Sequence, residues 1–384
     1  MLEINDKSIK NYVCEHSDEL FELHKALCLI PAPSHREERR AAFCKEWFDK
    51  NCCEGAYVDE AKNVILPYRT ESAEGLTVFC AHTDTVFPDL EPMPYSDDGE
   101  IIRSPGAGDD TAALAVLMLT ARYIIKNNVD VRGGVLFVAN SCEEGLGNLK
   151  GTRAVFSEYG DRIVRFVTYD SKFPTIADRS VGSHRYLVEV ATEGGHSWGA
   201  FGNKNAINEL SKIVSAIYAI ETPKKEGSKV TFNVGTIEGG TSVNTIAQSA
   251  KMLCEYRSDD RELLSFMEKE FARIFAAAEC DGVSVKVERV GDRPCMGDVD
   301  PEAQRRLAEI CARYVEAVRG ETVKFAASST DANIPLSLGI PAVASCVVSG
   351  EGTHTREELI YKTSLIDGLE VCIKTTIAAS NMED

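Results

Sequence analysis

The sequence predicts an α/β protein with a mostly parallel sheet covered by helices, interrupted by a second, smaller α+β domain. Four apolar runs predict buried strands, because they are continuous rather than alternating, as in strands covered on both faces. These runs span residues 76–81, 135–140, 164–169 and 342–347. The pattern of segments changes near residue 180, and 384 residues exceed the size at which a single core usually stops growing. Two domains are therefore expected.

The first domain begins with two amphipathic helices, over residues 17–30 and 36–50, separated by a Pro-Ala-Pro-Ser break. Ser34 is expected to cap the second helix, with Glu37 at the capping-box position. Strand-like and helical patterns then alternate, and they include a strongly apolar helix at 112–125. This alternation is typical of crossover units in a parallel sheet.

The second domain is predicted as a βαββαβ, ferredoxin-like unit. Its expected elements are a strand at 185–193, a helix at 203–220, strands at 229–237 and 246–257, a helix at 262–278 and a strand at 283–290. The alternating style then returns with a helix at 301–318. We therefore expect a discontinuous first domain of residues 1–179 and 293–384, with residues 180–292 inserted into it.

Charge and composition exclude several classes of function. The formal net charge is -18, with 60 acidic and 42 basic residues. Nucleic acids and anionic membranes both require a basic surface, so neither is an expected partner. The first twenty residues contain no apolar signal segment, and no run of eighteen apolar residues occurs. A cytoplasmic protein is expected.

Five side chains of metal-binding type lie far apart in the chain, nearly all just after a predicted buried strand. They are His82, Asp109, Glu144, Asp170 and His354. Ligand sites of open α/β sheets lie outside the carboxyl ends of the strands, so these residues are expected to converge on one crevice. Two imidazoles and three carboxylates suit paired zinc or similar divalent ions.

Each of these residues also has an ordinary interpretation when taken alone. His82 fits a structural histidine, and Asp109 fits the N-terminus of the following helix, where acidic groups are favourable. Glu143 and Glu144 fit a solvated charge pair, and Asp170 and His354 fit loop positions. The functional interpretation makes Asp109 a carboxylate shared by two ions and Glu143 the group that accepts a proton from water. The complete set favours this interpretation.

The order of these motifs resembles the co-catalytic di-zinc metallopeptidase family that includes peptidase T, carboxypeptidase G and the aminoacylases. The motifs are His82-x-Asp84, Gly-Asp109-Asp110, Glu143-Glu144, Asp170 and His354, and the resemblance extends over nearly the whole chain. It implies a phosphorylase/hydrolase-like catalytic domain and an inserted lid or dimerisation domain.

The resemblance also implies roles for the site residues. His82, Asp109 and Asp170 would bind one metal ion, and Asp109, Glu144 and His354 the other. The expected catalytic set comprises Glu143 as the base, Asp84 orienting His82, and His196 stabilising the oxyanion, often in the site of a partner subunit; for His196 a solvent-facing hairpin histidine is the alternative. Asn244 and Arg257 would contact a substrate carboxylate, and a cis peptide would join Asp109 to Asp110.

The activity implied by the resemblance is hydrolysis of the amide bond of short peptides, by an exopeptidase such as a tripeptide aminopeptidase or a dipeptidase. Two divalent metal ions would be its cofactors, zinc first, with cobalt or manganese as alternatives. An N-acyl amino acid amidohydrolase would use the same core, and a non-catalytic binding protein is a third hypothesis. A homodimer formed through the lid domain is expected. Thr111 and the pair Ser171-Lys172 depart from the residues common in the family, which leaves the subfamily open.

Overall fold

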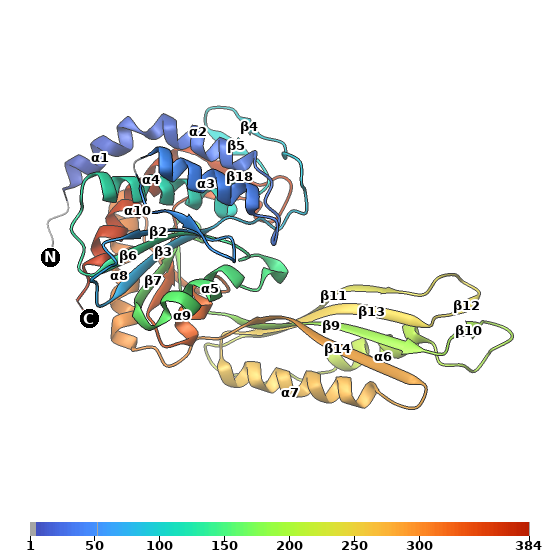
Figure 1. The fold of residues 1–384 in the computed structure, drawn as a ribbon. Coiled ribbons are helices and arrows are strands. Elements are labelled where there is room, and N and C mark those ends of the chain that lie inside the picture. Colours follow the sequence, from blue (N-terminus) through green and yellow to red (C-terminus); the bar gives the residue numbers. More distant parts are fainter. Residues whose placement is uncertain (1–4, 52, 384) are drawn as a thin grey trace. The chain divides into compact units, whose positions relative to one another are not determined.

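The structure is a computed structural model that describes residues 5–51 and 53–383. The chain divides into two compact units (Figure 1). One comprises Met1–Ser180 and Gly297–Asp384, and the other comprises Val181–Met296. The smaller unit is thus inserted between two segments of the larger one, and both connections follow strands of the units' sheets.

An eight-stranded mixed sheet forms the centre of the larger unit, in the order β1-β2-β6-β3-β7-β16-β8-β15. Its strands are β1 (Tyr57–Val58), β2 (Val64–Tyr68), β3 (Leu76–His82), β6 (Gly134–Asn140), β7 (Ile163–Thr168), β8 (Thr175–Ser180), β15 (Lys324–Ser328) and β16 (Ala342–Ala344). The four central strands β6, β3, β7 and β16 are parallel, as the continuous apolar runs predict. Antiparallel pairs at β1–β2, β2–β6 and β16–β8 make the whole sheet mixed.

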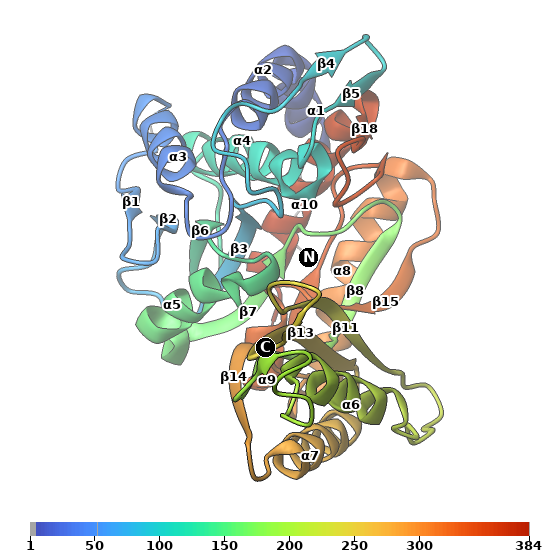
Figure 2. The same ribbon diagram turned by 90° about the vertical axis from the view of Figure 1, so that its right-hand side faces the viewer.

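Helices cover both faces of this sheet (Figures 1 and 2). They are α1 (Asp6–Glu15), α2 (Ser17–Cys28), α3 (Glu38–Lys50), α4 (Ala113–Lys126), α5 (Lys150–Tyr159), α8 (Pro301–Arg319), α9 (Asn333–Ser337) and α10 (Lys362–Ser380). Helices α4, α8 and α10 share one large core with Phe79 and Phe137 of the sheet. On the other face, Phe156 of α5 packs on Phe166 of β7 with 6.0 Å between ring centroids.

Two details of the N-terminal region differ from the sequence prediction. Helix α1 was not expected, although Ile9 and Val13 bury an apolar stripe there. Helix α3 begins at Glu38 without a side-chain cap, so the prediction that Ser34 caps it is wrong. The hydroxyl of Ser34 donates instead to Asp84 Oδ2 at 2.6 Å. A residue assigned to local helix capping therefore makes a contact across fifty residues of chain.

A small antiparallel sheet joins the C-terminal part of the larger unit to its middle. It has the order β17-β18-β5-β4, with β17 (Gly350–Glu351), β18 (Leu359–Tyr361), β5 (Ile101–Arg103) and β4 (Ser96–Asp97). Strand β18 pairs with β5 through Leu359 opposite Arg103 and Ile360 opposite Ile102. This pairing brings the turn that carries His354 beside the segment that leads to Asp109.

The smaller unit is a four-stranded antiparallel sheet with two helices, in the predicted βαββαβ order. Its elements are β9 (Gly182–Thr192), α6 (Ala206–Tyr218), β11 (Val230–Gly239), β13 (Ser249–Ser258), α7 (Arg261–Ala278) and β14 (Val283–Arg293), with a short ribbon of β10 (Gly195–His196) and β12 (Thr245–Ile246). The strand order is β11-β13-β9-β14. Residues of both helices and one sheet face form a separate core around Tyr256 and Phe271.

None of the helices within residues 5–51 and 53–383 combines the length and apolar character that crossing a bilayer requires. The cysteines in the same part of the chain form no disulfide.

Candidate metal centre

The five predicted ligands come together in the larger unit, where strands of the central sheet end. His82 is the last residue of β3, Asp170 follows β7, and Glu144 follows β6. Asp109 lies in η1 (Ala107–Ala112), the irregular turn that leads into α4. His354 lies in the turn between β17 and β18 and has a positive φ of 65°. Parallel strands that end at the same sheet edge therefore supply three of the five positions directly.

Two groups of three residues place one potential ligand atom each within 4.8 Å of the others. The first is His82, Asp109 and Asp170, and the second is Asp109, Glu144 and His354. These are the two sets that the family resemblance implies, with Asp109 common to both. A third group of the same kind consists of His82, Glu143 and Glu144, so Glu143 also faces this centre.

Asp109 contacts both imidazoles, each with a different carboxylate oxygen. Its Oδ1 lies 3.0 Å from His82 Nε2, and its Oδ2 lies 2.9 Å from His354 Nε2. Nε2 of His354 also lies 3.0 Å from Glu144 Oε1. A carboxylate whose two oxygens point to two separate ligand groups has the geometry of a bridge.

Burial and charge shift the pKa values of these groups in opposite directions. Burial alone would raise the pKa of Asp109, but the hydrogen bonds to His354 and His82 outweigh it and lower the pKa. Hydrogen bonds to Asp109 and Glu144 raise the pKa of His354 to about 10. Burial and the negative charges of Asp109 and Glu143 raise the pKa of Asp170 well above its usual value. The centre therefore has more buried carboxylate than its two imidazoles neutralise.

This donor set fits two divalent cations. Buried carboxylates are costly unless positive charge or hydrogen bonds compensate them, and divalent ions supply that charge. Imidazole nitrogen and carboxylate oxygen are the ligand types of zinc sites, and each group of three leaves room in a four-coordinate shell for water or substrate. The residues present thus match a pair of ions that share Asp109.

The orientation of His82 is fixed through its second ring nitrogen. Nδ1 lies 3.0 Å from the backbone carbonyl oxygen of Asp84 and 3.5 Å from Asp84 Oδ1. Donation from Nδ1–H to this carbonyl orients the ring so that Nε2 faces Asp109, and Nε2 would bind an ion after releasing its proton. The backbone of Asp84, more than its carboxylate, holds the ring.

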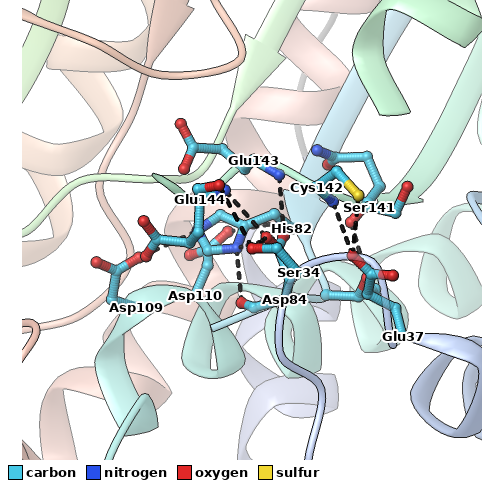
Figure 3. A network of polar contacts seen from close by, with 12 residues as sticks. Ser34, Glu37, His82, Asp84, Asp109, Asp110, Ser141, Cys142, Glu143 and Glu144 are labelled. Carbon is cyan, nitrogen blue, oxygen red and sulfur yellow. Dashed lines mark hydrogen bonds and ion pairs between the residues drawn. The ribbon is translucent and has the colours of Figure 1, made fainter. Parts of the chain in front are cut away.

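The carboxylate of Asp84 instead holds the loop that carries the two glutamates (Figure 3). Its Oδ1 accepts the backbone N–H of Glu143 and its Oδ2 that of Glu144, both at 3.0 Å. Oδ2 also accepts the hydroxyl of Ser34. Asp84 is fully buried, and although burial would raise its pKa, contacts with His82 and Ser34 lower it. An ionised carboxylate is thereby fixed beneath Glu143 and Glu144.

Cys142 precedes this glutamate pair and is held by Glu37. Oε1 of Glu37 accepts the backbone N–H of Cys142 at 3.2 Å and its thiol at 3.1 Å. Cys142 has a positive φ of 57°, so the chain bends sharply here. Burial, followed by the contact with Glu37, raises the pKa of Cys142 to about 12. The side chain is therefore a protonated thiol that shapes the loop, a state unsuited to nucleophilic attack.

Glu358 holds the backbone on the other side of the centre. Its carboxylate accepts N–H groups of Gly106, Gly108 and Asp109. Burial and the nearby charge of Asp109 raise the pKa of Glu358 to about 7. Asp110, joined to Asp109 by a cis peptide bond, accepts the backbone N–H of His82 at 3.0 Å.

Asp331 is a further buried carboxylate, located beside Asn140, where β6 ends and the loop that carries Glu143 and Glu144 begins. It accepts Nδ2 of Asn140 at 2.5 Å and the hydroxyl of Thr152. Asp331 is fully buried. The sequence predicts no role for Asp331 or Glu358, and the prediction of a capping-box role for Glu37 is wrong, because its carboxylate accepts from Cys142 instead. The one available signal was the position of Glu358 four residues after His354.

The other predicted site residues lie in the smaller unit. His196 is exposed on β10, and its Nδ1 accepts the backbone N–H groups of Trp198 and Gly199 at 3.3 Å. Asn244 is exposed and accepts the hydroxyl of Ser242. Arg257 forms an ion pair with Glu255, with Nε 2.7 Å from Oε1.

Comparisons with known proteins identify the family to which this chain belongs. A model described as peptidase family M20/M25/M40 matches residues 78–378. An uncharacterised protein, YqjE of Bacillus subtilis, is 25% identical over 82% of this chain and 83% of its own length. A probable carboxypeptidase of Trichophyton verrucosum is 24% identical over 61% of the chain, and the match spans 57% of that relative.

Solved structures share the fold over nearly the full chain. Aminopeptidase PepT of Bacillus cereus has a TM-score of 0.71 and 21% identity, covering 94% of this chain and 98% of its own. A dinuclear metal-binding peptidase of the M20 family, YXEP of Bacillus subtilis, has a TM-score of 0.64 and 14% identity, covering 95% of this chain and 98% of its own. Both matches therefore extend over the larger unit and the smaller inserted unit of this chain.

Proposed function

Because the chain belongs to the peptidase family M20/M25/M40 and is a metal-dependent peptide hydrolase, we propose that it is an exopeptidase that acts on short peptides. One observation carries this proposal: Asp109 directs one carboxylate oxygen to His82 and the other to His354. A peptidase with two co-catalytic ions needs such a shared ligand, because an anion between two cations offsets their repulsion.

The proposed ion sites use the two groups of residues that share Asp109. His82, Asp109 and Asp170 would hold one ion, and Asp109, Glu144 and His354 the other. We propose zinc for both sites, since mixed imidazole and carboxylate sets suit it, with cobalt or manganese as alternatives. When bound, the ions would polarise the scissile carbonyl and lower the pKa of the attacking water.

We assign the role of general base to Glu143. Its side chain is 4% exposed and faces His82 and Glu144, yet it belongs to neither of the two proposed ion sites. Its backbone is fixed by Asp84, which limits where the carboxylate can reach. Glu143 would take the proton of the attacking water and transfer it to the leaving amine.

His196 is proposed to donate a hydrogen bond to the oxyanion of the tetrahedral intermediate. Because Nδ1 accepts two backbone N–H groups, the neutral ring carries its proton on Nε2, which is then the available donor. Exposure of this side chain leaves it accessible to a substrate.

Asn244 and Arg257 are proposed to contact a carboxylate of the substrate. Two arginines share Glu255, since Arg185 Nε lies 3.1 Å from its Oε2 and Arg257 Nη2 lies 3.0 Å from the same atom. The Arg257 side chain is 37% exposed, and guanidinium groups bind carboxylates in a fixed fork. Short peptides and N-acyl amino acids both offer such a carboxylate.

We propose that the protein forms a homodimer through the smaller unit. Strand β11 is an edge strand of ten residues. Three large apolar side chains of the same unit are also strongly exposed: Trp198, Phe201 and Val243. Unpaired strand edges and exposed apolar groups are features of surfaces that associate.

We also propose a cytoplasmic location, because cysteines without disulfides, as in the described part of this chain, are typical of a reducing compartment.

The test combines metal analysis with a substrate panel. Purified protein is assayed for bound metal and for cleavage of dipeptides, tripeptides and N-acyl amino acids, before and after chelation. The proposal expects two equivalents of divalent metal and chelator-sensitive cleavage of short peptides. Cleavage of only the N-acyl amino acids would establish the deacylase instead. Metal-replete protein that cleaves no amide would favour a binding protein.

A further inference from the structure

Glu358 is a buried carboxylate that the proposed reaction does not use, and its position points to a specific task. The side chain has no exposed surface. Oε2 accepts the backbone N–H of Gly106 at 2.8 Å, and Oε1 accepts those of Gly108 and Asp109 at 3.1 Å each. Both oxygens are thus committed to the segment that ends at the shared ligand Asp109.

The backbone around Glu358 binds the same segment. The carbonyl oxygen of Glu358 accepts the N–H of Ser104 at 3.1 Å, and the next residues of β18 pair with β5. Residues 101–109 and 350–361 are therefore joined by strand pairing at one end and by the Glu358 carboxylate at the other. The two segments carry one proposed metal ligand each, Asp109 and His354.

We propose that Glu358 is a positioning residue that sets the separation of Asp109 and His354 and thereby the affinity of the ion site they form with Glu144. This inference rests on the proposed function. His354 lies four residues before Glu358, in a turn whose residues 351–357 are exposed. The Glu358 carboxylate accepts three backbone hydrogen bonds from the segment that ends at Asp109, and these bonds connect that segment to the turn.

Only a carboxylate of this length satisfies the three donors. In Glu358→Gln the amide nitrogen cannot accept a hydrogen bond. This donor group would therefore face another donor, either the N–H of Gly106 or those of Gly108 and Asp109. Gly108 is required for the close approach, because a Cβ atom there would lie 2.9 Å from Glu358 Oε1. The sequence thus places a residue without a side chain where the carboxylate comes nearest to the backbone.

A purely structural role for Glu358 predicts a different result from a positioning role. If the carboxylate only stabilises the fold, its replacement lowers the melting temperature while folded protein keeps its metal affinity. If it positions Asp109 against His354, folded protein loses metal affinity, most of all for the ion held by Asp109, Glu144 and His354. Changes to groups that orient metal ligands typically cost about 10- to 100-fold in metal affinity or activity.

The experiment is a metal titration of apoprotein against a competing chelator, with Zn²⁺, and with Co²⁺ followed by its visible absorption. Wild type, Glu358→Gln and the exposed neighbour Glu357→Gln are compared, with folding verified by circular dichroism. We expect wild type and Glu357→Gln each to bind two equivalents of metal, with affinities that do not differ between the two proteins. Glu358→Gln should bind one of them about 10- to 100-fold more weakly, with an altered Co²⁺ spectrum and with kcat reduced more than KM changes.

A folded Glu358→Gln protein that binds both ions with wild-type affinity and spectrum would overturn the inference. If this variant does not fold, Gly108→Ala replaces it, because the added methyl group displaces the carboxylate while Glu358 stays in the sequence; unchanged affinity there would equally overturn the inference. Wild-type protein that binds no divalent ion would refute the proposed function itself, so the two failures are distinguishable.

Discussion

The carboxylate of Asp84 accepts the backbone N–H of Glu143 at 3.0 Å, although the two residues lie 59 positions apart. The same carboxylate accepts the N–H of Glu144, so one buried anion fixes both the proposed base and a proposed metal ligand. The His-x-Asp motif had pointed to a carboxylate that steadies His82. In the structure the backbone carbonyl of Asp84 lies closer to that ring, and the carboxylate serves the glutamate loop.

Asp84→Asn is therefore expected to reduce turnover through the glutamate loop. The amide nitrogen would oppose one of the two N–H groups and shift Glu143 or Glu144 from its position. We expect kcat to fall by about 10- to 100-fold, as for other groups that support metal ligands. Steady-state kinetics measure the effect, and Asp161→Asn, on the exposed surface, is the matched control. Wild-type kinetics in Asp84→Asn would contradict the assigned role.

Glu143→Ala is expected to keep bound metal and lose nearly all turnover. Removing a general base costs about 10²- to 10⁴-fold in rate, and Glu143 belongs to neither proposed ion site. Metal content by elemental analysis and kcat on the best short peptide are the measurements. Activity comparable to wild type would remove Glu143 from the mechanism, and loss of metal would make it a ligand.

His196→Ala is expected to depress turnover with the metal still bound. Loss of one oxyanion donor costs about 10²- to 10³-fold in kcat. If His196 acts across a dimer, mixing His196→Ala with Glu143→Ala protein restores activity, since a mixed dimer contains one site with both residues intact. Absence of recovery under conditions that exchange subunits would assign His196 to its own subunit.

Chelation is expected to abolish activity and to lower the melting temperature. Ions that bind only the folded state stabilise it by mass action, about 3 kcal/mol at a free concentration one hundred times the dissociation constant. Their removal also leaves the carboxylates of Asp109, Asp170 and Glu144 close together with only two imidazoles to compensate their charge. Thermal unfolding with and without chelator, followed by readdition of zinc, cobalt or manganese, measures both effects. An unchanged melting temperature in metal-free protein would contradict this account.

His24 is expected to make the protein less stable as pH falls from about 6.5 to about 4. This ring is fully buried against the carbonyl oxygen of Ala107, and burial lowers its pKa to about 4. Above its ordinary pKa the ring is neutral in both states, so it contributes no pH dependence there. Below that value the unfolded chain takes up a proton that the folded state excludes, which lowers the free energy of unfolding by up to about 3 kcal/mol.

Urea unfolding of metal-free protein between pH 4.5 and 7.5 tests this prediction. His24→Gln retains a side-chain donor for Ala107 but cannot titrate, so its stability should depend less steeply on pH than that of wild type. Identical pH slopes in the two proteins would contradict the assignment.

Much of the fold could be predicted because its signals are local. The apolar runs of β3, β6 and β7 are continuous, and α4 is buried on all sides, so both are evident in the sequence. Helix α1 was missed because its burial depends on packing against other helices. Strand β16 is only three residues long, shorter than its apolar run.

The sequence by itself determined the chemical composition of the centre: two imidazoles and the carboxylates that accompany them, each near the end of a strand or a helix start. Only the tertiary structure decided how their backbones are held. Asp84, Glu358 and Glu37 fix the loops through hydrogen bonds across 59, 249 and 105 residues, respectively. Such contacts leave no periodic trace in the chain, because a buried carboxylate and a distant N–H meet only after the sheet and its connecting loops have folded.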